Sequence, residues 1–327
     1  MKKTKQKINH SFIKILTGSD LSYRRLALMS AKSKNPGPVV WLTGCIHGDE
    51  VGGIAVIQEV FKKIKNRPLL RGSLFAFPLM NPVGFEMVSR NLGVVQEDLN
   101  RSFPGDKNGS LVERITDKIF TTILKTKPNL VLDLHNDWLQ SIPYTIIDPY
   151  PGNKYREAYE KTKKLSLHTG FLVIDEGKDP EEDKILKKTL SGSLIRENIP
   201  ALTIELGGAY TIDEKIVAEG VKSIFKLLKE LGMSKESDNN LGFSIPPKLR
   251  NKILKYSHQP VVSTSGIIRF IVKPGQVVKK KQVLARVYNV FGELKETLFA
   301  TNDCVILGHA DSAVALPGEA VIACGVI

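Results

Sequence analysis

The chain has 327 residues, 42% of them hydrophobic and 25% charged, a composition typical of a globular protein with room for one large domain and a smaller one. The formal net charge is +13, but the basic residues are spread along the chain without a nucleic-acid-binding motif, so we expect no nucleic-acid partner. No apolar run is long enough to cross a membrane and none follows the basic N-terminus, so we expect neither a membrane partner nor a signal peptide.

Strands and helices alternate through the first two thirds of the chain. Residues 39–43 are a run of apolar and β-branched residues that predicts a buried strand ending at Gly44, and apolar residues at helical spacing predict a helix at 52–64. Further strands are predicted at 73–79, 130–134, 144–147, 171–174 and 201–206, and further helices at 111–124, 156–169, 189–198 and 213–231. This alternation favours an α/β fold with a mixed, mostly parallel sheet that helices cover on both faces.

The pattern changes after about Gly232. Residues 234–240 are polar, prolines at 246 and 247 interrupt the chain, and no helical spacing follows. Short strands separated by Gly and Pro turns are predicted at 266–272, 283–288 and 304–307. We therefore expect a first domain at 1–245 and a small C-terminal all-β domain at 246–327.

Three polar residues at the ends of predicted strands form a candidate metal site. His47 and Glu50 follow the first strand and lie three positions apart, so one helical turn brings both side chains to the same side. His135 directly follows another apolar strand, and open α/β sheets place their sites at such strand ends. A single histidine is more often structural than a ligand. Two of the six histidines in this setting favour a His2Glu zinc site with a fourth position open to water.

A polar loop at 97–105 lies between these candidate ligands. Such loops are usually no more than solvated surface, but Asn100 and Arg101 beside a metal would clamp a substrate carboxylate, which a guanidinium binds through two parallel hydrogen bonds. Arg90 is a candidate for stabilising a developing oxyanion.

Glu205 lies near the end of a very apolar strand, where a glutamate is rare without a partner. A base that activates water at the metal would explain it. Asp133 is a second carboxylate close to a candidate ligand, and it would orient His135 if the two side chains share a face of their strand.

Four blocks of sequence together resemble the succinylglutamate desuccinylase/aspartoacylase family of carboxypeptidase A-like zinc hydrolases. The blocks are Gly-x-x-His-Gly-x-Glu at 44–50, Asp-Leu-Asn-Arg at 98–101, Asp-Leu-His-Asn at 133–136 and Ile-Glu-Leu-Gly at 204–207. They occur in the family's order and cover most of residues 39–208. The resemblance implies a zinc carboxypeptidase-like fold for the first domain.

The resemblance also implies a role for each candidate residue. The implied ligands of one zinc ion per chain are His47, Glu50 and His135. Glu205 would be the general base and acid, and Arg90 would polarise the scissile carbonyl. Asn100 and Arg101 would hold the substrate carboxylate. Family members often use a tyrosine near the site, for which Tyr144 and Tyr210 are the candidates here.

The C-terminal domain resembles a biotinyl/lipoyl-type barrel. Residues 272–278 and 316–321 are similar to the paired turns of that fold, but the expected attachment hairpin at 288–293 has no lysine. The resemblance therefore implies an unmodified structural or lid-forming domain. A lid that narrows access to the zinc would favour small substrates over polypeptides.

These features predict a zinc-dependent amidohydrolase that cleaves the amide bond of an N-acyl amino acid or a similar small carboxylate-bearing substrate. The alternatives are a zinc carboxypeptidase acting on short or cell-wall peptides, and a non-catalytic metal- or anion-binding protein. The three cysteines suggest neither a disulfide framework nor a Cys-x-x-Cys metal site, so we expect a cytoplasmic protein. A homo-oligomer is left open, because symmetric dimers are common.

Overall fold

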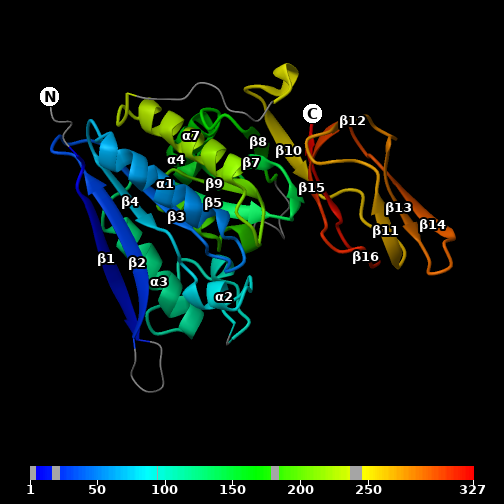
Figure 1. Cartoon of the computed structure of the whole chain (residues 1–327), viewed down its shortest axis with the longest axis horizontal. Helices are drawn as coiled ribbons and strands as arrows, with labels where there is room; N and C mark the ends of the chain where they lie inside the picture. The colour runs from blue at the N-terminus through cyan, green and yellow to red at the C-terminus, as the bar shows by residue number, and fades with distance from the viewer. Residues whose placement is uncertain (1–4, 17–22, 94, 178–183, 236–244) are drawn as a thin grey trace.

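The structure is a computed structural model that describes residues 5–16, 23–93, 95–177, 184–235 and 245–327. Its main feature is a 13-stranded sheet with helices on both faces (Figure 1). The strands run in the order β1-β2-β4-β3-β5-β9-β7-β8-β10-β17-β15-β12, with β6 paired to β15. Their bounds are β1 Ile8–Leu16, β2 Tyr23–Lys32, β3 Val39–Gly44, β4 Ser73–Phe77, β5 Leu130–Asp137, β6 Gln140–Ser141, β7 Pro143–Ile147, β8 Leu172–Asp175, β9 Ala201–Gly208, β10 Ile253–Ser257, β12 Val277–Val278, β15 Cys304–His309 and β17 Ile322–Val326.

The middle of this sheet is parallel. Strand β3 pairs in parallel with β4 and β5, and β5 pairs in parallel with β9. Antiparallel strands β1 and β2 extend one side, and β7 joins β9 in antiparallel orientation on the other. The predicted α/β fold with a mixed, helix-flanked sheet is therefore confirmed. The carboxyl ends of β3, β5 and β9 meet at one edge, where side chains from all three can converge.

Helices cover the two faces of the sheet as two separate apolar layers. Helices α1 (Gly52–Asn66) and α7 (Glu214–Glu230) pack on one face, and α3 (Leu111–Leu124) and α6 (Leu190–Ile195) pack on the other. The remaining helices in the described residues are α2 Pro82–Glu86 and α4 Arg156–Ser166, with short 3-10 turns η1 Leu99–Arg101, η2 Asn153–Tyr155 and η3 Pro247–Leu249. None of the described helices is long and apolar enough to span a bilayer.

The alternation of side chains along the central strands decides which residues face the site. In β9, Leu202, Ile204 and Leu206 belong to the apolar layer under α1 and α7. Thr203 and Glu205 therefore point to the opposite face, on the side of α3 and α6. The same period of two places Asp133 and His135 of β5 on that face, since Leu132 and Leu134 lie in the other layer.

The C-terminal part of the chain is all β. Strands β11 (Gly266–Phe270), β13 (Val283–Tyr288), β14 (Leu294–Phe299) and β16 (Val314–Ala315) form a separate four-stranded sheet in the order β14-β13-β11-β16. The other C-terminal strands extend the main sheet, because β10 pairs in parallel with β8. The division of the chain at residue 245 and the likeness to a biotinyl/lipoyl-type barrel stay predictions.

Candidate active site

His47, Glu50 and His135 converge at the carboxyl ends of β3 and β5, and all three are buried. The Nδ1 atom of His47 lies 2.6 Å from Oε1 of Glu50, and Nδ1 of His135 lies 2.8 Å from Oε2. One potential ligand atom from each residue lies within 4.8 Å of the other two. The sequence prediction that these residues come together is therefore met in the structure.

The outer nitrogens of both imidazole rings face carboxylates. Nε2 of His47 lies 3.2 Å from Oδ1 of Asp98, and Nε2 of His135 lies 3.0 Å from Oδ2 of Asp133. Thr43 donates to the other Asp133 oxygen at 2.6 Å, which fixes that carboxylate in turn. An Nε2–H donated to each aspartate leaves an Nδ1 lone pair on each ring directed at Glu50. In these tautomers two lone pairs and a carboxylate would repel one another unless a proton or a metal ion lay between them, so the donor set fits a metal ion.

Charge interactions in this cluster are strong. Burial by itself would raise the pKa of Glu50, but His47 and His135 hold it well below its usual value. Burial would lower the pKa of His135, but Asp133 and Glu50 raise it well above its usual value. Each group is thus held in its charged form by its neighbours. A bound cation would take the place of the imidazole protons in this balance.

Gly48, between the two ligands of this loop, is required by a close approach of backbones. A Cβ at this position would lie 1.9 Å from the carbonyl carbon of Gly84, and the Gly48 amide donates to Ser89 at 3.0 Å. A side chain here would displace the loop that carries His47 and Glu50. The Gly in the His-Gly-x-Glu motif therefore serves the geometry of the ligands.

Arg90 reaches the site from the loop after α2. Its side chain is 46% exposed, and its Nε and NH2 atoms donate to Oδ2 of Asp98 at 3.2 and 3.1 Å. NH1 lies 3.4 Å from Oε1 of Glu50. Burial would raise the pKa of Asp98, but the His47 hydrogen bond and Arg90 hold it well below its usual value. Asp98 thus joins Arg90 to the candidate ligand His47.

Asn100 and Arg101 lie in η1, against the same cavity. The amide oxygen of Asn100 accepts a hydrogen bond at 2.9 Å from the backbone of Leu190, the first residue of α6. The Arg101 guanidinium donates to the Asn100 carbonyl at 2.9 Å, and it forms no ion pair with any residue that the structure describes. Arg101 therefore keeps donors for an anionic ligand, while Asn100 has a structural contact of its own.

Glu205 projects from β9 into the cavity, opposite His135 in the strand register. Its Oε2 atom is buried and has no hydrogen-bond partner among the described residues. Burial, together with Glu50 and Asp137 and against the opposing effect of His135, raises the pKa of Glu205 well above its usual value. A carboxyl group that holds its proton this readily is suited to proton transfer.

The two tyrosine candidates occupy different positions. Tyr144 is buried and donates to Oδ2 of Asp137 at 2.7 Å. Tyr210 is 52% exposed, and its backbone amide donates to the carbonyl of Asp49 at 2.8 Å. Neither residue lines the cavity into which Glu205 projects.

The site opens into a cavity of about 150 Å³. All seven candidate residues from the sequence line it: His47, Glu50, Arg90, Asn100, Arg101, His135 and Glu205. The other polar residues of its wall were not predicted as site residues from the sequence: Asn136, Asp137, Asp148, Glu176, Thr189, Ser191 and Thr203. Thr203 could have been predicted, because it lies two residues before Glu205 in the same strand and so faces the same side. Asp148 and Glu176 follow β7 and β8, and their place depends on the antiparallel pairing of β7 with β9, which no sequence motif specifies.

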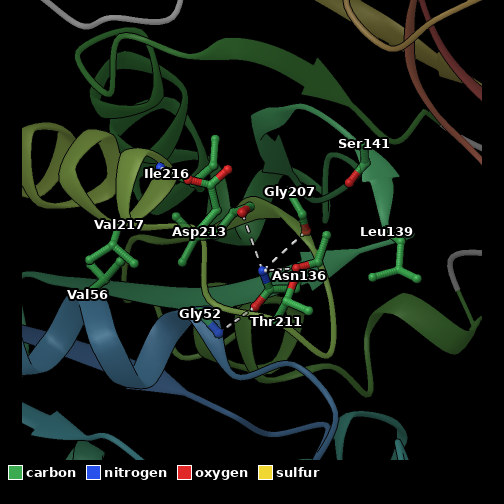
Figure 2. Close-up of a pocket in the computed structure, with 12 residues that line it drawn as sticks. Gly52, Val56, Asn136, Leu139, Ser141, Gly207, Thr211, Asp213, Ile216 and Val217 are labelled. Atoms are coloured by element: carbon green, nitrogen blue, oxygen red, sulfur yellow. Dashed lines mark hydrogen bonds between the residues drawn. The ribbon is translucent and has the colours of Figure 1, made fainter.

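Asn136 lines this cavity and also a second one of about 160 Å³, whose lining residues are drawn in Figure 2. Its side-chain oxygen accepts from the Gly52 amide at 2.9 Å, at the start of α1. Its side-chain nitrogen donates to the carbonyls of Gly207 and Gly208 at 3.2 and 3.0 Å, and its backbone amide donates to Glu50 at 3.0 Å. Asn136 therefore ties the ends of β5 and β9 to the first turn of α1 and holds the Glu50 carboxylate in place.

Comparison with known proteins identifies similar chains. Residues 36–231 match the family model described as the succinylglutamate desuccinylase/aspartoacylase catalytic domain. An N-alpha-acetyl-L-2,4-diaminobutyric acid deacetylase from Halomonas elongata is 26% identical over 290 residues, which cover 86% of this chain and 80% of the relative.

Solved structures share the fold over nearly the whole chain. A product-bound ectoine utilization protein from Ruegeria pomeroyi has a TM-score of 0.81 at 21% identity, covering 98% of this chain and 95% of that one. A succinylglutamate desuccinylase from Silicibacter sp. has a TM-score of 0.79 at 19% identity, covering 98% and 94%. At these identities the likeness concerns the fold.

Proposed function

Because the chain belongs to the succinylglutamate desuccinylase/aspartoacylase family, we propose that it is a zinc-dependent amidohydrolase that removes the acyl group from a small N-acyl amino acid. Relatives in this family are named as deacetylases and desuccinylases, which act on amide bonds. The observation that carries the proposal is the buried His47–Glu50–His135 cluster beside Glu205, in one cavity with Arg101.

His47, Glu50 and His135 would hold the ion through two Nδ1 atoms and a carboxylate. A zinc ion in such a site supplies Lewis-acid polarisation of a carbonyl group and makes water a nucleophile near neutral pH. Asp98 and Asp133 orient the two imidazole rings from outside the cluster. Their carboxylates also increase the basicity of the ring nitrogens that face Glu50.

Glu205 would move the protons of the reaction. Its carboxylate takes a proton from the attacking water and then delivers it to the amine nitrogen of the leaving amino acid. The buried Oε2 atom, which has no partner in the described part of the chain, is free for this transfer. Arg90 would stabilise the developing oxyanion, although Asp98 holds two of its nitrogens at 3.2 and 3.1 Å.

Arg101 would bind the carboxylate of the substrate. Its guanidinium lines the cavity and, in the described part of the chain, pairs with no carboxylate. Asn100 would support this role by positioning η1 against α6 and by the hydrogen bond from Arg101 to its carbonyl.

A substrate screen on zinc-loaded protein tests the proposal. Acetyl-, succinyl- and aspartyl-type acyl amino acids are compared with dipeptides, with chelated protein and Glu205→Gln as controls. We expect release of the free amino acid from at least one acyl amino acid, lost on chelation and restored by zinc. Hydrolysis of dipeptides alone would favour the carboxypeptidase alternative, and zinc binding without turnover of any substrate would favour the non-catalytic one.

A further inference from the structure

Asp98 does not line the active-site cavity, but it contacts two residues that do. Its Oδ1 atom faces Nε2 of His47 at 3.2 Å, and its Oδ2 atom accepts from Nε and NH2 of Arg90 at 3.2 and 3.1 Å. The proposed mechanism uses the contact with His47 and gives the contact with Arg90 no role. One carboxylate thus joins a candidate metal ligand to the candidate oxyanion donor.

The Asp98 carboxylate is itself held in one place. Its Oδ1 atom accepts from the backbone amide of Asn100 at 2.7 Å, and the Ser102 hydroxyl donates to the Asp98 carbonyl at 3.1 Å. Only 17% of its side chain is exposed. Because the turn η1 fixes both the backbone and the side chain of Asp98, its Oδ2 atom is an acceptor with a defined direction.

Arg90 has no comparable support of its own. Its side chain is half-exposed on the loop after α2, where a long side chain has many rotamers available. Asp98 takes Nε and NH2, and the remaining nitrogen, NH1, lies 3.4 Å from Oε1 of Glu50. A guanidinium is planar and rigid, so holding two of its nitrogens sets the direction of the third. NH1 is thereby directed at the metal ligands.

Resting on the proposed function, we propose that Asp98 is a positioning residue for Arg90, which it holds so that NH1 is presented to the oxyanion that develops beside the metal ligands. The same carboxylate orients His47, so one side chain fixes the ligand and the oxyanion donor relative to each other. Donors that are already in place cost no reorganisation when the charge develops. Asp98 would not touch the substrate.

Chemical rescue of Arg90→Ala tests this inference on the intact zinc-loaded protein. The variant should lose about 10²- to 10³-fold in kcat, the usual effect of removing one oxyanion donor. Methylguanidinium, at concentrations that leave the melting temperature unchanged, should restore about tenfold or more, because Asp98 supplies a charged acceptor that holds it. With Asp98→Asn added, at saturating zinc, rescue should be lost. With Asp106→Asn added instead, an exposed carboxylate before α3 is altered and rescue should persist. Equal rescue in the two double variants, including none in both, would overturn the inference.

Arg90→Lys gives a second readout that leaves Asp98 unaltered. Lysine keeps the positive charge, but its compact ammonium group lacks the planar fork that reaches from Asp98 to the oxyanion. Zinc content and melting temperature should stay close to those of the wild type. Most of kcat should be lost with little change in KM, because the missing contact is made only in the transition state. Wild-type kcat in Arg90→Lys would show that a point charge suffices and would contradict the role of Asp98.

Binding of a transition-state analogue separates this inference from the proposed function. A phosphinate analogue of the acyl amino acid carries a tetrahedral oxyanion in place of the amide carbonyl. Calorimetry on zinc-saturated protein should show its affinity reduced about tenfold or more in Arg90→Ala and in Asp98→Asn, with little further loss in the double variant. Fully additive losses in an enzyme that is active as the wild type would overturn the inference alone. Wild-type protein that hydrolyses no acyl amino acid and binds no analogue would overturn the proposed function as well.

Discussion

Asp133 and His135 lie two residues apart on one face of β5, with Oδ2 of the aspartate 3.0 Å from Nε2 of the histidine. The period of two in a strand makes this contact possible, and the donation from Thr43 to Oδ1 at 2.6 Å holds the carboxylate in place. His135 is thereby fixed with Nδ1 toward Glu50. The orientation of a candidate ligand thus depends on two buried residues that would not touch the metal.

The variant Asp133→Asn should weaken zinc binding about 10- to 100-fold, as loss of the outer partner of a metal-bound histidine usually does. Asparagine is uncharged and has one acceptor oxygen, so it cannot accept from both Thr43 and His135 as the carboxylate does. His135 then loses its fixed tautomer. Competition with a chromophoric chelator measures the affinity. Asp303→Asn is the control, because Asp303 is an exposed carboxylate of the C-terminal part of the chain and does not line the cavity. Unchanged affinity in Asp133→Asn would show that Asp133 does not orient the ligand.

Removal of the metal should abolish amide hydrolysis and lower the melting temperature. A ligand at 100 times its dissociation constant stabilises the folded state by about 2.7 kcal/mol, so the change is measurable. Chelator treatment followed by differential scanning calorimetry, with and without added zinc, checks both effects. His47→Ala should reproduce the chelated state, with less than one zinc per chain by elemental analysis. Full activity in metal-free protein would contradict the metal assignment.

Glu205→Gln should lower kcat by about 10²- to 10⁴-fold, the usual contribution of a general acid–base residue. The amide fills the same space but cannot accept a proton from water. Zinc content should remain close to that of the wild type, and the melting temperature should not fall, because Oε2 has no hydrogen-bond partner among the described residues and burial disfavours the charged carboxylate. Single-turnover kinetics with elemental analysis separate these effects. A variant that binds zinc and keeps wild-type kcat would exclude Glu205 as the base.

Asn100→Ala should destabilise the protein by about 1 to 3 kcal/mol, because the amide of Leu190 loses its acceptor in a buried position. Urea unfolding at equilibrium measures this change. Asn100→Asp keeps an acceptor oxygen at the same place and is expected to recover most of the stability. If the alanine variant were as stable as the wild type but had a raised KM, Asn100 would serve the substrate alone.

Asp148→Asn should raise stability above pH 7 and have little effect near pH 4. Burial, opposed by Ser191, Arg196 and Thr189, raises the pKa of Asp148 from its ordinary 3.8 to about 6. The folded protein therefore binds this proton more tightly than the unfolded chain does. The stability that the proton contributes is complete below about pH 4 and is lost as the pH rises through 6.

The rise in the Asp148 pKa corresponds to about 3 kcal/mol at most. Melting temperatures of the wild type and Asp148→Asn between pH 4 and pH 8 give the comparison. The difference should grow between about pH 4 and pH 6 and then stay level. A difference that is constant from pH 4 to pH 8 would indicate a cause other than ionisation of Asp148.

The sequence predicted the central strands and helices well where burial is complete. The β-branched run at 39–43 became β3, and the apolar periodicity at 111–124 became α3 with the same bounds. The antiparallel pair β1 and β2 escaped prediction, because these strands have many exposed residues and no clean apolar pattern. The extension of the main sheet by β10 depends on long-range pairing with β8, which local patterns do not encode.

Some residues of the candidate site were likewise predictable from the sequence, and others were not. Residues at the ends of parallel strands, such as His47 and His135, were predictable because topology alone brings those ends together. The roles of Asp98 and Arg90 depend on the path of residues 88–93 and 95–98, where Val88 and Gln96 adopt positive φ angles of 51° and 54°. Such backbone conformations are unusual for these residue types, so no propensity predicts them. The position of Asp148 in the site depends on the antiparallel direction of β7 next to β9, which no local sequence pattern specifies.

The pairing of β10 with β8, and of β6 with Gly308 and His309 in β15, limits how the active site can open. A hinge rotation of the C-terminal strands away from the rest would break both ladders and expose their backbone groups. The cavity is therefore expected to admit substrate through loop motion over a rigid frame. Loop closure can exclude water from a site, and loop opening is often the slow step of turnover.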